Sequence, residues 1–131
     1  MADIIMVNYK ADNSVAGRAV VDMQLGLKHG AVGFDRSERV RRGDRVLVKA
    51  GWTGPWAAGV ILRENDAHTD LWQKHGGRTW RRTFDVEFLT PVVQKAPGLS
   101  LKEAKACHWS QRGSKRVWHK AWDAIVGQSI L

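Results

Sequence analysis

The chain has a single cysteine, Cys107, and it contains no run of apolar residues near the eighteen or so that a membrane-spanning helix requires. One cysteine excludes an internal disulfide and a cysteine-rich zinc site, and it fits a reducing compartment. The N-terminus, MADIIMVNYK, lacks a basic segment followed by a long apolar stretch, so it does not resemble a secretory signal. These absences predict a cytoplasmic protein with no membrane partner, in which Cys107 is a small buried hydrophobe.

Familiar catalytic and cofactor-binding patterns are also missing. The chain has no phosphate-binding P-loop, no GxSxG nucleophile turn and no GxGxxG fingerprint. Its five histidines do not show the spacing of HExxH or of a comparable metal site. The sequence therefore predicts neither a metal nor a cofactor, and nothing in it requires catalysis.

Positive charge is what the chain has in excess, with 21 lysines and arginines against 13 aspartates and glutamates, a formal net charge of +8. Such a surplus favours a polyanionic partner, because the counterions released on binding add to the affinity. Nucleic acid is the leading candidate, and a merely basic soluble protein is the alternative. The residues predicted to form a face for the nucleic-acid backbone are Arg39, Arg41, Arg42, Arg78, Arg81, Arg82, Lys115 and Arg116.

Hydrophobic periodicity predicts an α+β protein of about five to six short strands with two or three flanking helices. A chain of 131 residues suits one domain, and the order of elements indicates a small barrel. The predicted strands cover residues 3–9, 31–34, 45–50, 56–64 and 83–89, the middle two forming a hairpin. The predicted helices cover residues 14–29, a segment from 100 and a last segment from 117.

Capping residues and apolar spacing support these helices. Asn13 or Ser14 is the predicted N-cap of the first helix and Gly30 ends it, while Ser100 and Glu103 form a predicted capping box. In the last helix a stripe of three large apolar residues is predicted to face the core, namely Trp118, Trp122 and Ile125.

Four of the seven tryptophans fall in loops or at a turn. Trp72 and Trp80 stand in a polar, glycine-containing loop among arginines, where an indole has no obvious core to join. Aromatic faces beside positive charge are the mixture that holds an unstacked base next to a phosphate backbone. The alternative is that one indole plugs the end of the barrel. Trp52 and Trp56 flank the hairpin turn, where they either cover a barrel end or stack on a base.

Three segments in order resemble YTH domains. LWQKHGGRTWRRTFDVEFLTPVVQKAPGLSL (71–101) is similar to the closing part of that family, in which a tryptophan-bearing loop runs into a strand and a proline-containing turn. RVLVKAGWTGPWAAGVI (45–61) resembles its hairpin, and IIMVNYKADNSVAGRAV (4–20) with HGAVGF (29–34) resembles its first strand, helix and second strand. GDRVL (43–47) is also similar to the related EVE domain. The chain thereby resembles a YTH/EVE-type member of the PUA-like superfamily.

This resemblance implies one PUA-like domain over residues 1–131, in which a modified base enters an aromatic cage. By position, Phe34, Trp72 and Trp80 match the cage walls and Asn13 matches a polar residue at the base edge. YTH domains usually carry tryptophan followed by serine or threonine where this chain has Phe34 and Asp35. A carboxylate accepts a hydrogen bond from the amine of cytosine, so Asp35 favours cytosine as the base.

The predicted function is therefore a non-enzymatic reader that binds a modified base, such as a methylated one, in DNA or RNA after the base is flipped or while it is unpaired. It acts alone or as the sensor of a restriction or defence system. The alternative is an ASCH-like hydrolase of a modified nucleoside that uses Lys49, Thr53 and Glu64. The sequence leaves open the identity of the base, the choice between DNA and RNA, and the oligomeric state.

Overall fold

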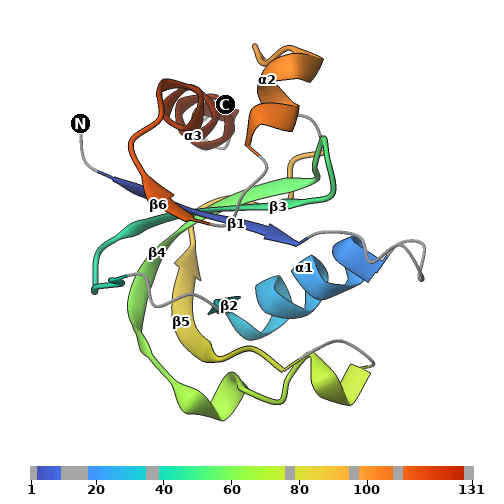
Figure 1. Ribbon diagram of the computed structural model, residues 1–131, viewed down its shortest axis with the longest axis vertical. Coiled ribbons are helices and arrows are strands. Elements are labelled where there is room, and N and C mark those ends of the chain that lie inside the picture. The colour runs from blue at the N-terminus through green and yellow to red at the C-terminus, as the bar shows by residue number, and fades with distance from the viewer. Residues whose placement is uncertain are drawn as a thin grey trace.

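The computed structural model of the protein describes residues 3–9, 18–34, 39–75, 79–94, 98–107 and 111–128. Within these residues the chain forms one six-stranded sheet, three α-helices and two short 3-10 helices (Figure 1). The strands are β1 (Ile4–Tyr9), β2 (Ala31–Phe34), β3 (Arg45–Ala50), β4 (Trp56–Glu64), β5 (Arg82–Phe88) and β6 (Gln111–Gly113). The helices are α1 (Arg18–His29), α2 (Leu101–Ala106) and α3 (Arg116–Gln128), with η1 (Asp66–His68) and η2 (Gln73–His75) between β4 and β5.

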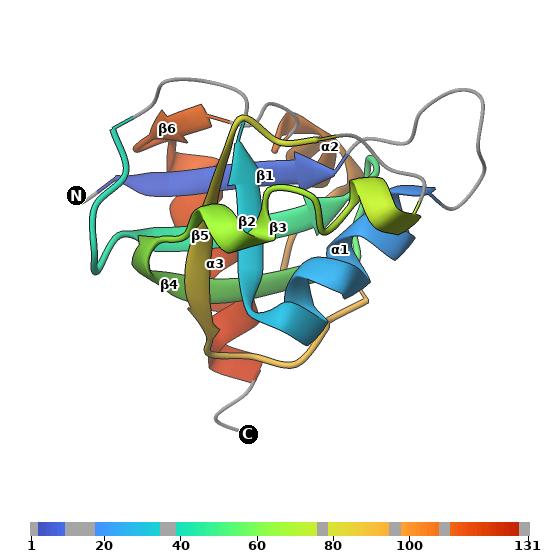
Figure 2. The ribbon, with the colours of Figure 1, turned by 90° about the horizontal axis from the view of Figure 1, so that it is seen from below.

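The sheet has the strand order β2-β5-β4-β3-β1-β6 and curls into a half-barrel. β1 pairs with β3 in parallel, whereas all the other neighbouring pairs are antiparallel. A shift of register between Ile61 and Arg63 interrupts the β4–β5 ladder, and such bulges bend a strand. Seen from below, β2 and β5 run across the direction of β1, β3 and β4, which shows how far the sheet curls (Figure 2).

Both faces of the central strands are buried, and each face belongs to a different core. In β1, Ile5, Val7 and Tyr9 point into a first core with α1, while Ile4 and Met6 point into a second core with α2 and α3. This division follows from the strand geometry, because successive side chains point to opposite faces. In Figure 1, α2 and α3 accordingly lie on one side of the sheet and α1 on the other.

The α+β class and the positions of most elements are confirmed. The strands at 31–34, 45–50 and 56–64 have the predicted bounds, and β5 begins one residue earlier than predicted. The first helix is described from Arg18, since the preceding positions of the prediction lie outside the described residues, and it is followed by Gly30 at φ +60°. The sequence did not predict β6, η1 or η2, and their residues were assigned to connections.

The C-terminal helices are also confirmed in detail. The capping box of α2 is present: Ser100 Oγ accepts from the Glu103 N–H at 3.1 Å, and Glu103 Oε1 accepts from the Ser100 N–H at 2.9 Å. The predicted apolar stripe of α3 is buried, and so is Cys107. None of the helices in the described part of the chain combines the length and the apolar character needed to cross a membrane.

Candidate functional site

Three aromatic side chains from distant parts of the chain meet at one end of the first core. The ring centroids of Trp72 and Trp80 are 6.0 Å apart with the planes nearly perpendicular, at 76°. Tyr9 lies 6.0 Å from Trp80 and 6.3 Å from Trp72, tilted by only 33° from the latter ring. Trp72, Trp80 and Tyr9, here called the aromatic cluster, therefore form a triangle in which one ring stands edge-on to the other two. The structure thus brings together the two tryptophans that the resemblance assigned to a cage.

Packing and hydrogen bonding hold the two indoles in place. Trp72 Nε1 donates to the carbonyl oxygen of Asp22 in α1 at 2.8 Å. Trp80 lies directly on Gly33 of β2, where a Cβ atom would come within 2.3 Å of the indole. Glycine is therefore required at position 33, because any side chain would occupy the space of the ring.

The expectation that both indoles lie in an open polar loop is wrong for this structure. Trp72 is fully buried and Trp80 is 9% exposed, and both belong to the first core. The reason is that residues 65–75 fold back over the sheet through η1 and η2 and contact α1, so the indoles do have a core to join. Two walls that hold a base between them need about 7 Å between ring planes. The separation of 6.3 Å between Tyr9 and Trp72 leaves no such gap.

Phe34 has a different neighbour from the one that the cage assignment gives it. Its ring contacts Phe84 edge-on at 5.8 Å, and the alternation of β2 directs it away from the face on which Trp80 covers Gly33. Tyr9, which sequence reasoning missed, is the third member of the aromatic cluster. Its place in the alternating strand, on the same face as the buried Val7, was the available signal. Asn13 and Asp35 lie outside the described residues.

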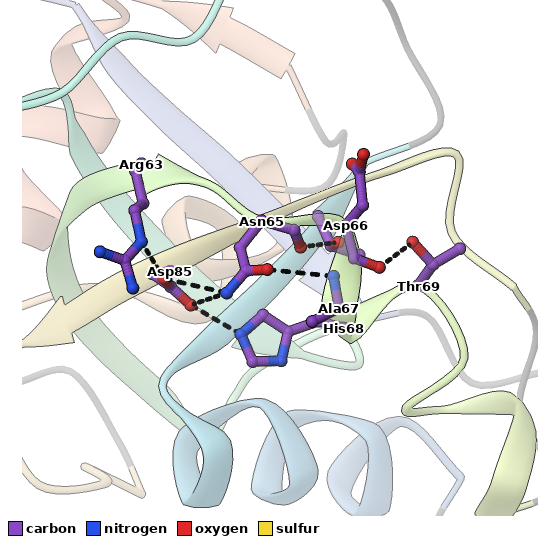
Figure 3. Close-up of polar contacts among 8 residues, drawn as sticks. Arg63, Asn65, Asp66, Ala67, His68, Thr69 and Asp85 are labelled. Carbon is purple, nitrogen blue, oxygen red and sulfur yellow. Dashed lines mark hydrogen bonds and ion pairs between the residues drawn. The ribbon is translucent and has the colours of Figure 1, made fainter.

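A polar network fastens the segment that carries Trp72 to β5 (Figure 3). The Asp85 carboxylate pairs with His68 Nε2 at 2.6 Å and with Arg63 Nε at 2.7 Å, and it accepts from Asn65 Nδ2 at 3.2 Å. Asn65 also caps η1, where its Oδ1 accepts from the Ala67 N–H at 3.0 Å. Asp85 is thus the centre of a clamp that fixes the start of the 65–75 segment and, through it, the position of Trp72.

Asp85→Asn is expected to lower the free energy of unfolding by about 1–3 kcal/mol at neutral pH, since hydrogen bonds to a charged group are lost. Burial acts to raise the pKa of Asp85, but the hydrogen bonds from His68, Asn65 and Arg63 outweigh it and hold the pKa below the usual value of an aspartate. A carboxyl group with a lowered folded-state pKa stabilises the protein above its unfolded-state pKa and loses that contribution on further acidification.

Urea denaturation of the parent and of Asp85→Asn between pH 2 and pH 7 measures this contribution. The difference in stability between the two proteins should shrink as the pH falls below about 4. Glu87→Gln, an exposed change on the same strand, is the control that should leave stability nearly unchanged. A difference that stays constant down to the lowest pH would contradict the charge-based account of the clamp.

The basic residues predicted for a nucleic-acid backbone differ in how available they are. Arg82 is half-buried, and its guanidinium donates to both carboxylate oxygens of Glu64, at 3.1 and 3.2 Å. Arg78 lies outside the described residues. The remaining predicted residues are exposed, namely Arg39, Arg41, Arg42, Arg81, Lys115 and Arg116.

The backbone of residues 39–42, here called the basic loop, is held by two side chains, those of Arg112 and Asp44. The sequence did not indicate this role for either residue. Arg112 of β6 donates from Nη1 to the Arg39 carbonyl oxygen at 2.6 Å and to Asp44 Oδ2 at 2.7 Å. Asp44 Oδ2 in turn accepts from the Arg41 N–H at 2.7 Å. Figures 1 and 2 both show this part of the chain beside β6, at the end of the sheet where α3 begins. The loop is therefore held against Arg112 of β6, which comes three residues before Lys115 in the chain.

A buried lysine lies on the other face of the sheet. Lys49 is fully buried; its Nζ donates to the carbonyl oxygens of Trp52 and Ala104, both at 2.9 Å, and lies 5.4 Å from the Trp56 ring centroid. Burial lowers the pKa of Lys49 to about 8, while the neighbouring Cys107 acts in the opposite direction. Burial likewise raises the pKa of the Cys107 thiol to about 11. Lys49 thus connects the hairpin turn to α2.

The three residues considered for an ASCH-like hydrolase are not brought together. Lys49 and Thr53 lie at the hairpin turn, but Glu64 stands at the far end of β4 and pairs with Arg82. Glu64 comes eight positions after Trp56, the strand partner of Lys49, which corresponds to roughly 26 Å of extended chain. That set of residues therefore gives no assembled hydrolytic site.

A serine and a histidine in contact near α3 do not form a nucleophile and base either. Ser114 Oγ lies 3.0 Å from His119 Nε2, and Arg45 Nη2 lies 3.4 Å from His119 Nδ1. Arginine only donates, so Nδ1 of the neutral ring accepts and Nε2 carries the proton. A ring in this tautomer donates to the serine hydroxyl and does not remove its proton.

The described residues hold no group of three or more histidine, cysteine, aspartate or glutamate side chains arranged to bind a metal ion. The features that remain as a candidate site are the aromatic cluster, the basic loop and the hairpin turn with Trp52 and Trp56. Compared with known proteins, the chain matches no family model, no curated protein and no solved structure.

Proposed function

We propose that this protein is a YTH/EVE-type, PUA-like reader that binds nucleic acid carrying a modified base. The half-barrel sheet with helices on both faces supports the proposal, because it agrees with the small barrel that the resemblance implies. The net charge of +8 supports a polyanionic partner. In this proposal the protein binds without catalysing a reaction and takes up one base that is unpaired or flipped out of a duplex.

The observation that carries the proposal is the fixed backbone of the basic loop. Arg112 and Asp44 hold the main chain of the loop, while the side chains of Arg39, Arg41 and Arg42 remain exposed. Phosphate contacts made from a backbone that is already ordered cost less conformational entropy on binding. Three guanidinium groups on such a loop, which is bonded to the strand that leads to Lys115 and Arg116, are a suitable contact surface for phosphates.

Selectivity for a modified base needs a second element, because phosphate contacts carry no base information. The aromatic cluster is one candidate, with Trp72 and Trp80 as walls. It would have to widen, since the rings of Tyr9 and Trp72 are 6.3 Å apart and a base between two walls needs about 7 Å. A methyl group adds only about 0.8 kcal/mol of buried apolar surface, so the shape of the site must contribute to selectivity as well.

The double substitution Arg41→Ala and Arg42→Ala is expected to weaken binding to single-stranded and double-stranded oligonucleotides of every sequence. The slope of log affinity against log salt should shrink by roughly two units, one for each lost phosphate contact. Alanine retains the hydrogen bond from the backbone of residue 41 to Asp44, so the loop should stay in place. Fluorescence anisotropy over a range of salt concentrations measures both quantities.

Lys28→Ala combined with Lys74→Ala is the matched control. It removes the same charge from two exposed positions outside the basic loop, on α1 and η2. This control should weaken binding only slightly. An equal loss of affinity and slope in both double variants would show that net charge, and not the basic loop, drives binding.

A further inference from the structure

A hollow lies next to the hairpin turn. It has a volume of about 430 Å³ and lies between the turn that joins β3 to β4 and the segment leading into α2. Figure 1 shows the end of the hairpin and α2 on the same side of the molecule. The hollow, here called the turn pocket, is lined by Thr53, Trp56, Gln94, Leu99, Ser100, Leu101 and Ala104.

The size and the rim of the turn pocket indicate a small planar ligand. Its volume falls in the lower part of the range of about 300–1,000 Å³ that is typical of small-molecule sites. Leu101, which lines the pocket, is 61% exposed, and Trp52, which precedes the lining residue Thr53, is 58% exposed. These are the two most exposed large apolar side chains in the described part of the chain. The Trp52 carbonyl oxygen shares Lys49 Nζ with that of the lining residue Ala104, which places the Trp52 main chain near the turn pocket. An exposed indole carried at this turn provides a stacking surface for an aromatic ring.

The lining offers apolar contact together with a few hydrogen-bonding groups. Trp56, Leu99 and Ala104 supply the apolar part, while Thr53 and Gln94 supply polar side chains. A glutamine amide presents two donors and one acceptor, which is the combination that pairs with the edge of a nucleobase. Trp56 is held in place because its Nε1 donates to the Thr53 carbonyl oxygen at 3.0 Å.

Positive charge on and behind α2, the helix whose residues Leu101 and Ala104 line the turn pocket, favours an anionic ligand. The ammonium group of Lys49 lies behind the lining, bonded to the Ala104 carbonyl oxygen, and Lys102 and Lys105 are exposed on α2. The acidic residue of that helix, Glu103, is engaged by Lys120, whose Nζ donates to its carboxylate at 2.8 and 3.1 Å. An aromatic heterocycle that carries a phosphate matches this combination of stacking surface, polar groups and positive charge.

We infer that the turn pocket binds the base of a nucleotide, with Trp52 stacked on the ring and Gln94 and Thr53 at its polar edge. Within the proposed function, on which this inference rests, the turn pocket is the place where the base is read, and the aromatic cluster is part of the core. The same chemistry is shared by a free mononucleotide and by one nucleotide of a strand.

Trp52→Ala tests the assignment, because an exposed indole is removed at small cost to folding. The probes are nucleoside 5′-monophosphates and otherwise identical single-stranded oligonucleotides with and without one methylated base. Loss of the stacking contact should weaken binding by roughly five- to a hundred-fold and leave the salt slope unchanged. Leu62→Ala, which removes a 40% exposed side chain from the far part of β4, is the control and should bind like the parent.

The binding results distinguish a failure of the turn-pocket assignment from a failure of the proposed function. Affinity that falls for the oligonucleotides but not for the monophosphates supports a base of a strand, and a loss for both supports a free nucleotide as well. Full affinity and full discrimination in Trp52→Ala would overturn the assignment, most directly if a folded Trp72→Phe protein lost discrimination instead. A parent protein that binds monophosphates through Trp52 but binds no oligonucleotide would retain the turn pocket and refute the proposed reader.

Discussion

Trp72→Ala is expected to lower the free energy of unfolding by about 3–5 kcal/mol, the usual range for removing a buried tryptophan. The indole is fully buried in the first core, in ring contact with Tyr9 and Trp80, so its loss leaves a cavity between α1 and the sheet. Trp72→Phe should still cost about 1–3 kcal/mol, because the Asp22 carbonyl oxygen loses the donor that lies 2.8 Å away. Urea denaturation followed by far-UV circular dichroism measures both variants.

Trp52→Ala is the matched control for this prediction, since it removes the same side chain from an exposed position. Its stability should stay within about 0.5 kcal/mol of the parent. The burial of Trp72 would be contradicted if Trp72→Ala unfolded like the parent. If that variant also lost discrimination between methylated and unmodified oligonucleotides, the aromatic cluster would be the base-binding cage that the resemblance implies.

The elements with strong periodicity were predictable because their signal is local. In β3 and β4 short runs of apolar, partly β-branched residues stand on both sides of a turn marked by Gly54 and Pro55, and the hairpin forms over the predicted residues. The stripe of Trp118, Trp122 and Ile125 recurs at helical spacing, and α3 buries it. In each case the residues that decide the structure lie within a few positions of one another.

The environment of Trp72 was not predictable from its neighbours, because distant residues create it. The loop around it is polar and contains glycine, which is typical of an exposed connection. Its actual position depends on Asp85, which pairs with His68 17 residues away, and on Asp22, which accepts from Trp72 across 50 residues. Neither contact leaves a periodic pattern in the sequence.

The same limit applies to β6 and to Lys49. β6 has three residues without apolar alternation, and its place depends on pairing with β1 and on the bonds of Arg112 to Asp3 and Asp44. Lys49 falls at a position in β3 where alternation predicts a solvent-facing side chain. It is buried because α2 covers that face of the sheet, and strands covered on both faces do not show the alternation of an exposed sheet.

Removing the Trp118 indole should also have a large effect on the free energy of unfolding. Because Trp118 and Trp72 are both buried, comparing their variants separates the contribution of the indole hydrogen bond from that of packing. Trp118→Ala is expected to cost about 3–5 kcal/mol, because the ring is 1% exposed and packs against Gly113 in the second core. Trp118→Phe should behave differently from Trp72→Phe. Trp118 Nε1 is buried without a hydrogen-bond partner among the described residues, so phenylalanine removes an unsatisfied donor that costs about 1–3 kcal/mol.

That gain offsets the loss from the smaller ring, so the stability of Trp118→Phe should lie within about 1 kcal/mol of the parent. Trp72→Phe should then be the less stable of the two phenylalanine variants, although both positions are buried to the same degree. Urea denaturation under identical conditions measures the difference directly. Equal losses of stability in the two phenylalanine variants would mean that the hydrogen bond from Trp72 to Asp22 contributes nothing to stability beyond the packing of the ring. A loss in Trp118→Phe as large as in Trp118→Ala would mean that shape alone decides stability in the second core.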